Sequence, residues 1–310
     1  MSLDPTKLPD PPMPSYTFTV YHRDVFEKYK FKDYNSLLEN RLARCNARAR
    51  YLASVLESQN GAQGGEMLEL VPKSTDIFYG DHRPVKVTKD QTGEKNFSAF
   101  TSGILGVGRA VQYSLPTQFG GHVMFMCLPP FYSGKGSVLS FHTSKWPRAT
   151  SAKLLFNYRY PSFYYVNLYK DFINDLEVPV SPSWWKFKPY MSSGVLVDTG
   201  TSFTYFPNDF YVVFHYIFRA EPFDTCYKED PSGRGLYFTI VKLYFGSVSS
   251  STMLLLEKEQ VVINYRGLYC LAFVGWDRDQ SVLGMMELQG VGLTFDTLAN
   301  TLSFDIDACD

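Results

Sequence analysis

The stretch Gly194–Ser202 reads Gly-Val-Leu-Val-Asp-Thr-Gly-Thr-Ser, and the rest of the sequence is interpreted outward from it. Its apolar half predicts a buried strand that ends in a tight polar loop with the carboxylate of Asp198 at the tip. Gly200 permits a turn that a residue with a Cβ would strain. Hydroxyls can orient a carboxylate so that it acts as a general base toward water. Three loop residues carry them: Thr199, Thr201 and Ser202. The same residues also favour an ordinary strand-end turn, so both interpretations stay open on this stretch alone.

The composition is typical of a folded protein rich in strands. A chain of 310 residues is long enough for one large or two medium domains. The hydrophobic content of 45% and charged content of 20% argue against disorder, and the aromatic content of 16% favours strands. The net charge of −1 supplies no long-range field. We therefore expect neither a nucleic-acid nor a membrane partner, and we expect a monomer.

The N-terminal part predicts a helical module. Residues 1–15 predict a disordered leader, and residues 16–21 alternate as a short strand does. Leucines recur at near-helical spacing over Asp33–Glu57, which predicts a helix, and the run 59–65 is a flexible linker. Arginines interleave with the leucines: Arg41, Arg44, Arg48 and Arg50. The plainest interpretation of these charges is a solvated helix face.

From Leu68 onward, short apolar runs are broken by Gly, Pro, Asn and Ser. This pattern predicts many short strands in a barrel or sandwich, for example at 123–126, 163–168, 236–241 and 290–295. One later helix is predicted over Asn208–Phe218. No apolar run is long enough for a membrane helix, and no signal peptide is visible at the start of the sequence.

Asp198–Ser202 resembles the second catalytic motif of pepsin-like aspartic proteases, whose active site takes one Asp from each of two homologous lobes. Other segments resemble the plant, nepenthesin-like branch of that family, in the family's order. They are Ser102–Arg109, Ser114–Gln118, Met126–Pro130, Phe163–Val166, Phe223–Tyr227, Cys270–Phe273 and the terminal Cys309. The resemblance covers roughly residues 97–310. It implies an all-β, bilobal pepsin-like fold.

The N-terminal module resembles the propeptide of the same plant proteins, because Tyr21-His22-Arg23-Asp24 precedes an arginine-rich helix. In the family this segment is removed on activation, and its cations can pair with carboxylates of the cleft and block them. The resemblance thus implies three parts. Residues 1–65 are a leader and propeptide-like segment, residues 66–154 an abridged N-terminal β lobe, and residues 155–310 a complete C-terminal lobe carrying Asp198.

The sequence contains Asp-Thr-Gly only once. The family reaction needs two carboxylates that share a proton, one to activate water and one to donate to the peptide carbonyl. The interval 61–78, where the first motif should lie, offers only Asp76 in an unmatched context. Tyr79-Gly80-Asp81 resembles the start of the family's flap, which makes Tyr79 a candidate flap tyrosine; a plain turn is the alternative. A lone Asp198 lacks the acid half of the mechanism.

The resemblance also implies a disulfide between Cys226 and Cys270. Cys127 and Cys309 could form a second bridge and leave Cys45 as the odd thiol, while five reduced cysteines would fit a cytosolic chain. No Cys-x-x-Cys pair occurs and the histidines are scattered, so we expect no metal and no cofactor. By resemblance the protein is secreted, apoplastic or vacuolar.

Two functions follow from this resemblance. The first is an aspartic endopeptidase relative acting on polypeptides, with Asp198 as its surviving catalytic aspartate, Thr199 and Thr201 as orienting residues, and activity impaired or absent in this chain. The second is a non-catalytic pseudoprotease or an inhibitor-like binding protein, as with the plant xylanase inhibitors on the same scaffold. A gene model that omits an exon with the first motif is a third interpretation.

Overall fold

The chain is described from a computed structural model. The structure describes residues 15–21, 24, 28–57, 107–109, 114–130, 133, 135–142, 151–179, 181, 186–191, 193–218, 226–228, 240–247, 249–306 and 308–309. The linker 59–65, Tyr79 and the strand predicted within 236–239 lie outside these residues. The division into 1–65, 66–154 and 155–310 stays a prediction.

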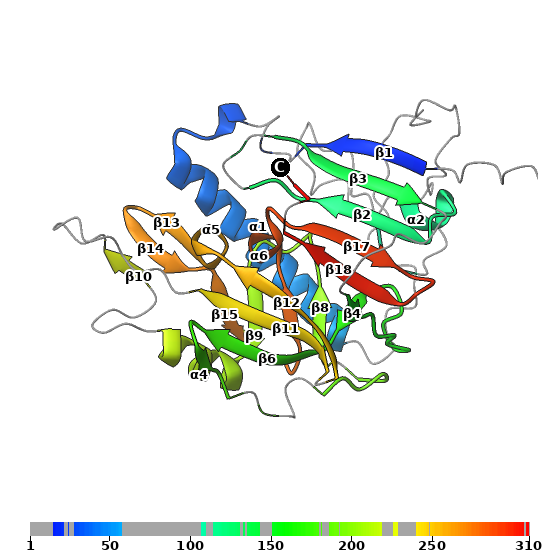
Figure 1. The fold of residues 1–310 in the computed structure, drawn as a ribbon. Coiled ribbons are helices and arrows are strands. Elements are labelled where there is room, and N and C mark those ends of the chain that lie inside the picture. Colours follow the sequence, from blue (N-terminus) through cyan, green and yellow to red (C-terminus); the bar gives the residue numbers. More distant parts are fainter. Residues whose placement is uncertain are drawn as a thin grey trace, which may run out of the picture.

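The strands of the described residues form four sheets (Figure 1). The largest has six antiparallel strands, in the order β1 (Ser15–Val20), β3 (Ser137–His142), β2 (Val123–Cys127), β17 (Gly292–Asp296), β18 (Thr301–Asp305) and β4 (Ala152–Lys153). A four-stranded sheet has the order β12 (Ser250–Leu256), β11 (Val241–Ser247), β6 (Leu168–Ile173) and β7 (Leu176–Glu177). A three-stranded sheet contains β10 (Cys226–Lys228), β14 (Leu268–Leu271) and β13 (Val262–Tyr265).

The remaining sheet is mixed and carries the Asp198 loop. Its order is β15 (Phe273–Trp276), β9 (Thr204–Pro207), β16 (Ser281–Leu283), β8 (Val195–Val197) and β5 (Tyr164–Val166). β8 runs parallel to β16 in the register Val197 to Leu283. Both strands therefore end at the same edge of the sheet, where the loop after β8 meets the turn after β16.

Several helices accompany these sheets. They are a 3₁₀ turn at Lys28–Lys30, α1 (Tyr34–Glu57), α2 (Leu115–Gln118), α4 (Asn208–Phe218), α5 (Lys258–Val261) and α6 (Met285–Leu288). The sequence predicted α4 with these bounds and α1 one residue longer at its start. None of the helices in the described part of the chain is long and apolar enough to cross a membrane.

Helix α1 packs along one stripe against the mixed sheet, and in Figure 1 it runs, in blue, diagonally behind the front strands. The stripe consists of Leu38, Cys45, Ala49, Leu52 and Leu56, all less than 9% exposed. These positions recur three, four or seven apart, so they share one helix face. They join a cluster that includes Tyr160, Tyr165, Leu196, Tyr205 and Trp276. A second cluster of buried hydrophobic residues, which includes Phe141, Phe206 and Phe245, forms the rest of the core.

Two disulfides join distant parts of the chain. The family resemblance implied the first of them, and the second was one possibility that the sequence left open. Cys226 lies directly opposite Cys270 in the pairing of β10 with β14. Cys127, the last residue of β2, is bonded to Cys309 near the end of the chain. Cys45 is a free, buried thiol on α1.

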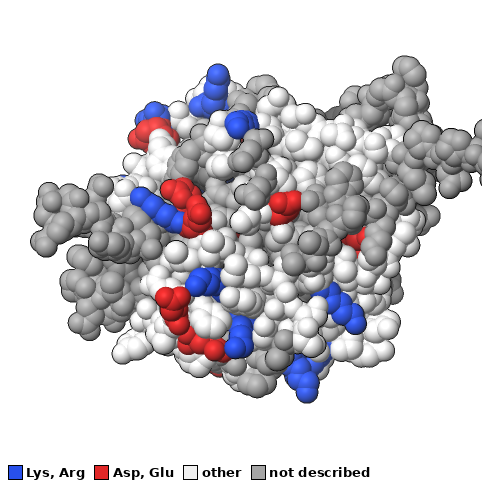
Figure 2. Space-filling model, in the orientation of Figure 1, with Lys and Arg blue, Asp and Glu red and all other residues white. Residues whose placement is uncertain are grey.

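The charged side chains visible on the face in Figure 2 are mixed in sign. Acidic and basic residues of the described chain stand next to one another or singly over a mostly uncharged surface. This arrangement agrees with the net charge of −1. The described residues visible on that face form no broad field of one sign that could steer a charged ligand.

Replacing Leu52 by Ala should destabilise the protein strongly, because the side chain is fully buried between α1 and the mixed sheet. We expect the free energy of unfolding to fall by about 2–5 kcal/mol, the range for buried Leu-to-Ala changes. Leu298→Ala is the matched control, since Leu298 is 60% exposed and should change the value by less than about 0.5 kcal/mol. Urea unfolding measures both. Equal effects of the two substitutions would contradict the packing of α1.

Candidate active site

The Asp198 loop is joined by backbone hydrogen bonds to the segment that follows β16. The Asp198 N–H donates to the Leu283 carbonyl over 3.1 Å. The N–H groups of Met285 and Met286 donate to the carbonyls of Thr201 and Ser202 over 2.7 and 2.8 Å. A turn that is bonded at both ends to a neighbouring strand and helix has little freedom to move. The position of the Asp198 carboxylate is therefore set by the sheet.

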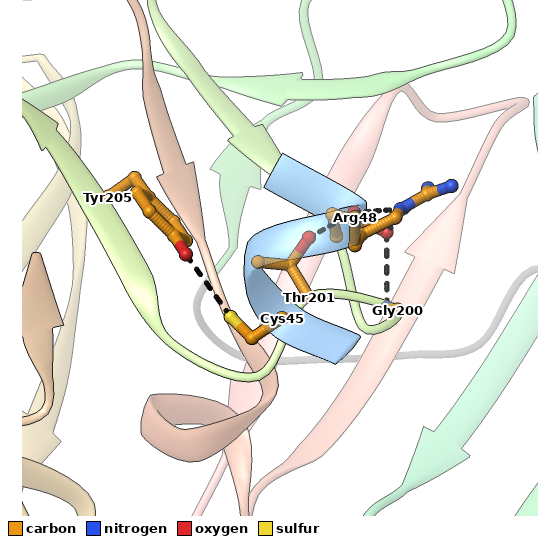
Figure 3. Close-up of polar contacts among 6 residues, drawn as sticks. Cys45, Arg48, Gly200, Thr201 and Tyr205 are labelled. Carbon is orange, nitrogen blue, oxygen red and sulfur yellow. Dashed lines mark hydrogen bonds and ion pairs between the residues drawn. The ribbon is translucent and has the colours of Figure 1, made fainter. Parts of the chain in front are cut away.

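Two groups of the loop hold the carboxylate itself (Figure 3). The Gly200 N–H donates to Oδ1 of Asp198 over 3.1 Å, and the Thr201 hydroxyl donates to Oδ2 over 2.6 Å. The sequence predicted the role of the Thr201 hydroxyl, whereas it gave Gly200 only a role in the turn. Thr199 was also predicted to orient Asp198, but neither Thr199 nor Ser202, which the structure describes fully, hydrogen-bonds this carboxylate. Thr201 is the loop's orienting hydroxyl.

Gly200 leaves room for side-chain groups that approach it closely. A Cβ at this position would lie 3.1 Å from Oδ1 of Asp198 and 3.6 Å from Nε of Arg48. The sequence argument expected a backbone conformation that only glycine tolerates, whereas φ at Gly200 is not in the left-handed range. The constraint is therefore one of space above the carboxylate.

Arg48 of α1 occupies that space. Its Nε donates to Oδ2 of Asp198 over 3.0 Å and its Nη2 donates to Oδ1 over 3.2 Å. This is the paired fork geometry in which a guanidinium binds a carboxylate most strongly. Only 13% of the Asp198 side chain and 25% of the Arg48 side chain remain exposed. Each carboxylate oxygen thus accepts one hydrogen bond from the loop and one from α1.

Cys45 lies one helical turn before Arg48 and fixes the same part of α1. Its Sγ lies 3.3 Å from the Tyr205 hydroxyl, at the start of β9 (Figure 3). Burial, with a smaller contribution from Cys45, raises the pKa of Tyr205. The Tyr205 hydroxyl is therefore uncharged, and its contact with Cys45 belongs to the packed interface between α1 and the mixed sheet.

The other arginines of α1 have separate partners. Arg41 Nε donates to Asp24 over 2.5 Å, and Arg44 Nη2 donates to the same carboxylate over 2.8 Å. Asp24 is only 6% exposed. Arg50 is exposed, and its guanidinium bonds the carbonyl of Asn46 within the helix. The interpretation of these arginines as one solvated face is therefore wrong for three of the four.

A buried carboxyl supports the loop from behind. Glu287 of α6 accepts a hydrogen bond from the Thr204 hydroxyl over 2.8 Å, and that hydroxyl accepts the Gly284 N–H over 3.0 Å. Glu287 is fully buried, and burial raises its pKa from 4.5 to about 8. These two hydrogen bonds, from Gly284 to Thr204 and from Thr204 to Glu287, therefore join the turn after β16 to the strand that follows the Asp198 loop.

Parts of the chain are similar in sequence to known proteins. Residues 163–305 match the family model described as Xylanase inhibitor C-terminal. The Arabidopsis thaliana protein named ASPARTIC PROTEASE IN GUARD CELL 2 is 26% identical over 236 residues, which are 70% of this chain and 49% of that relative. Aspartic proteinase nepenthesin-1 of Nepenthes gracilis is 24% identical over 226 residues, which are 67% of this chain and 50% of that relative. The chain is similar to members of the plant pepsin-like aspartic protease family. It spans about half the length of the curated relatives it matches.

Solved structures show the same fold. The structure titled edgp aligns with a TM-score of 0.56 at 21% identity, covering 68% of this chain and 61% of that one. Basic 7S globulin from soybean aligns with a TM-score of 0.54 at 19% identity, covering 69% and 60%. The all-β, pepsin-like fold predicted for this aspartic protease relative is confirmed.

Sequence reasoning placed the Asp198 loop but missed two members of the site. It noted Arg48 only as one of four similar arginines, and it did not consider Glu287. Tyr79, the candidate flap residue, lies outside the described residues and stays a prediction. Among the described residues, no group of three or more His, Cys, Asp and Glu side chains could hold a metal ion.

Glu287→Gln should change how the stability of this aspartic protease relative depends on pH. A carboxyl whose pKa is raised in the folded state contributes stability below its ordinary value of 4.5, and that stability is lost as the pH rises toward 8. A pKa that differs by one between the folded and unfolded states corresponds to about 1.4 kcal/mol, so ionised Glu287 destabilises the fold by roughly a few kcal/mol. We expect the variant to gain stability relative to the wild type between pH 4 and pH 8, by urea unfolding.

Glu177→Gln is the matched control, because Glu177 lies on β7 with its side chain 52% exposed. Its stability curve should run parallel to that of the wild type over the same range. A Glu287→Gln curve that is also parallel to the wild type would contradict the assignment of a buried, neutral carboxyl.

Proposed function

We propose that this chain is a catalytically silent relative of the aspartic endopeptidases, with Asp198 as its surviving catalytic-type aspartate. The paired hydrogen bonds from Arg48 to both oxygens of Asp198 carry this proposal. Peptide hydrolysis by this family requires water between two carboxyl groups, one ionised and one protonated. The guanidinium occupies the place where such a water would bind Asp198. The single Asp-Thr-Gly motif in the sequence supplies no second carboxyl group.

Arg48 cannot replace the missing acid. A guanidinium keeps its proton throughout the pH range in which proteins are folded, so it cannot donate one to a leaving group. It can only neutralise Asp198 and exclude water from it. The site therefore retains the orienting half of the family's chemistry, through Gly200 and Thr201, without the proton transfer that completes hydrolysis.

Polypeptide binding without cleavage is the role that remains. A second candidate function names a more specific class of binding partner. The match of residues 163–305 to the family model described as Xylanase inhibitor C-terminal favours an inhibitor-like protein that binds a glycoside hydrolase. In this role Asp198 takes no part in contact with the partner, since Arg48 covers it.

We also propose a secreted, apoplastic or vacuolar location. The two disulfides persist best in an oxidising compartment. Asp171 on β6 is fully buried, and burial raises its pKa well above the ordinary value, as it does for Glu287. Both groups contribute stability that is present at low pH and is lost as the pH rises.

The proposal of catalytic silence is tested by cleavage of denatured globin at acid pH, with and without pepstatin. We expect the wild type, Arg48→Ala and Asp198→Asn to release peptides at the same background rate, because uncovering Asp198 does not create a second carboxyl. Pepstatin-sensitive cleavage by the wild type or by Arg48→Ala, absent from Asp198→Asn, would show that the chain is a working peptidase.

The inhibitor-like candidate is tested by adding the purified protein to a set of purified xylanases and measuring residual activity. Inhibition that saturates with the protein, and that is unchanged in Asp198→Asn, would support it. Full xylanase activity in the presence of micromolar protein would exclude xylanases as partners, and polypeptide binding would remain as the proposed role.

A further inference from the structure

Three aromatic side chains lie on the surface where two loops meet. One loop contains residues 156–159, between β4 and β5, and the other contains residues 186–191, between β7 and β8. The exposed fraction is 36% for Phe156, 60% for Tyr158 and 67% for Tyr190. Single exposed aromatic residues are ordinary on a protein surface, whereas contiguous ones mark binding sites. These three residues are called the aromatic platform below.

The rings of the aromatic platform contact one another. Tyr158 and Tyr190 are stacked, with ring centroids 4.9 Å apart and planes 15° from parallel. Phe156 meets Tyr158 edge to face, with centroids 5.1 Å apart. Neither tyrosine hydroxyl is hydrogen-bonded to another residue in the described part of the chain. The platform therefore presents flat apolar faces and two hydroxyls that are available to a ligand.

Hydrogen bonds hold the backbone beneath the platform. The Tyr158 N–H donates to the Pro189 carbonyl over 2.7 Å and so joins the two loops. The buried Asn157 side chain joins them again, because its Nδ2 donates to the Met191 carbonyl over 2.8 Å while its Oδ1 accepts the Arg159 N–H over 2.9 Å. The two tyrosines thus hold their arrangement without a ligand. Binding to such a preorganised surface costs little conformational entropy.

The charged side chains of the two loops and their flanks are all basic. Residues 151–170 and 178–197 contain no Asp and no Glu. Their basic residues are Lys153, Arg159, Lys170, Lys186 and Lys188. A ligand that lies along these loops therefore meets cations of the protein and no local anions. Negative charge on the ligand is favoured by this arrangement.

Arg109 adds a further cation at the end of the platform. Its guanidinium carbon lies 5.2 Å from the centre of the Phe156 ring. The side chain is only 9% exposed, and it donates to the Leu155 carbonyl and to the Asn300 side-chain oxygen, which are both neutral. Among the described residues no carboxylate pairs with Arg109. Its positive charge is thus left for a ligand to balance.

The size of the platform favours a narrow chain as the ligand. An aromatic side chain buries about 150–250 Å² when fully covered, so the three partly exposed rings offer on the order of 300 Å². A stable protein interface takes about 800 Å² from each partner. Single-stranded nucleic acid also stacks on aromatic rings, but it relies on an extended basic groove, and the net charge of −1 does not favour one.

We propose that the aromatic platform binds an acidic polysaccharide. A sugar ring has a flat C–H face that packs on an aromatic ring, and its hydroxyls pair with tyrosine hydroxyls. A uronic acid unit adds a carboxylate that the cations of the two loops can bind. The proposal goes beyond the proposed function, because it involves neither Asp198 nor Arg48 and requires neither cleavage nor a polypeptide partner.

The first experiment measures binding of an oligomer of galacturonate to the full-length protein by isothermal titration calorimetry. We expect saturable binding by the wild type. Tyr158→Ala and Tyr190→Ala should each raise the dissociation constant about tenfold, because each removes a stacked ring. Tyr190→Phe keeps the ring and should have a smaller effect. Tyr216→Ala is the matched control, since Tyr216 is also highly exposed but lies on α4.

The second experiment tests the charge of the ligand. The methyl-esterified oligomer has the same rings without the carboxylates, and we expect it to bind more weakly than the free acid. Added salt should weaken binding of the acid and leave binding of the ester unchanged. Lys188→Gln should raise the dissociation constant for the acid about threefold, as expected for an exposed ion pair. Lys135→Gln is the matched control, because Lys135 is exposed and lies outside the two loops.

Three results would overturn the proposal. They are no saturable binding of the galacturonate oligomer, equal binding by the wild type and the two alanine variants, and equally tight binding of polyglutamate with the same dependence on the tyrosines. The last result would assign the platform to acidic polypeptides. Asp198→Asn should bind the oligomer as the wild type does, so the outcomes of the globin and xylanase assays leave this test unaffected.

Discussion

The pair of Arg48 with Asp198 is the interaction on which the arrangement of this molecule depends. It joins α1, from the beginning of the described chain, to a loop 150 positions later in the sequence. A mostly buried ion pair stabilises a fold only where both partners are already held in position, because each charge loses its hydration. Here the backbone bonds to the β16 turn hold Asp198, and the apolar stripe of α1 holds Arg48. The two sets of contacts and the pair therefore require one another.

The features that the sequence predicted are those whose contacts are local. Gly200 and Thr201 are two and three residues from Asp198, so a short motif contains the whole of their interaction. In the same way, the spacing of the leucines is sufficient to predict the apolar stripe of α1. Arg48 is different, because four arginines on one helix are equivalent until the helix is placed. Glu287 is 83 positions from Thr204, and nothing in its neighbourhood of the sequence indicates that contact.

The family resemblance added long-range information that periodicity could not supply. It implied the pairing of Cys226 with Cys270, and it implied that cations of the N-terminal module could meet a carboxylate of the cleft. It did not identify which cation, and it could not separate Thr199 from Thr201. Those distinctions depend on side-chain direction at the turn, which the sheet and α1 determine together.

Water activation and guanidinium binding make the same demand on Asp198. Each requires an ionised carboxylate, aimed in one direction, with two of its lone pairs occupied by donors of its own loop. Gly200 and Thr201 meet that demand for either purpose. What distinguishes a hydrolase from a docking site is the group placed opposite: a second carboxyl can hold a water and give up a proton, whereas a guanidinium can do neither. In this chain α1 places Arg48 there, so each oxygen of Asp198 accepts one hydrogen bond from its own loop and one from the guanidinium.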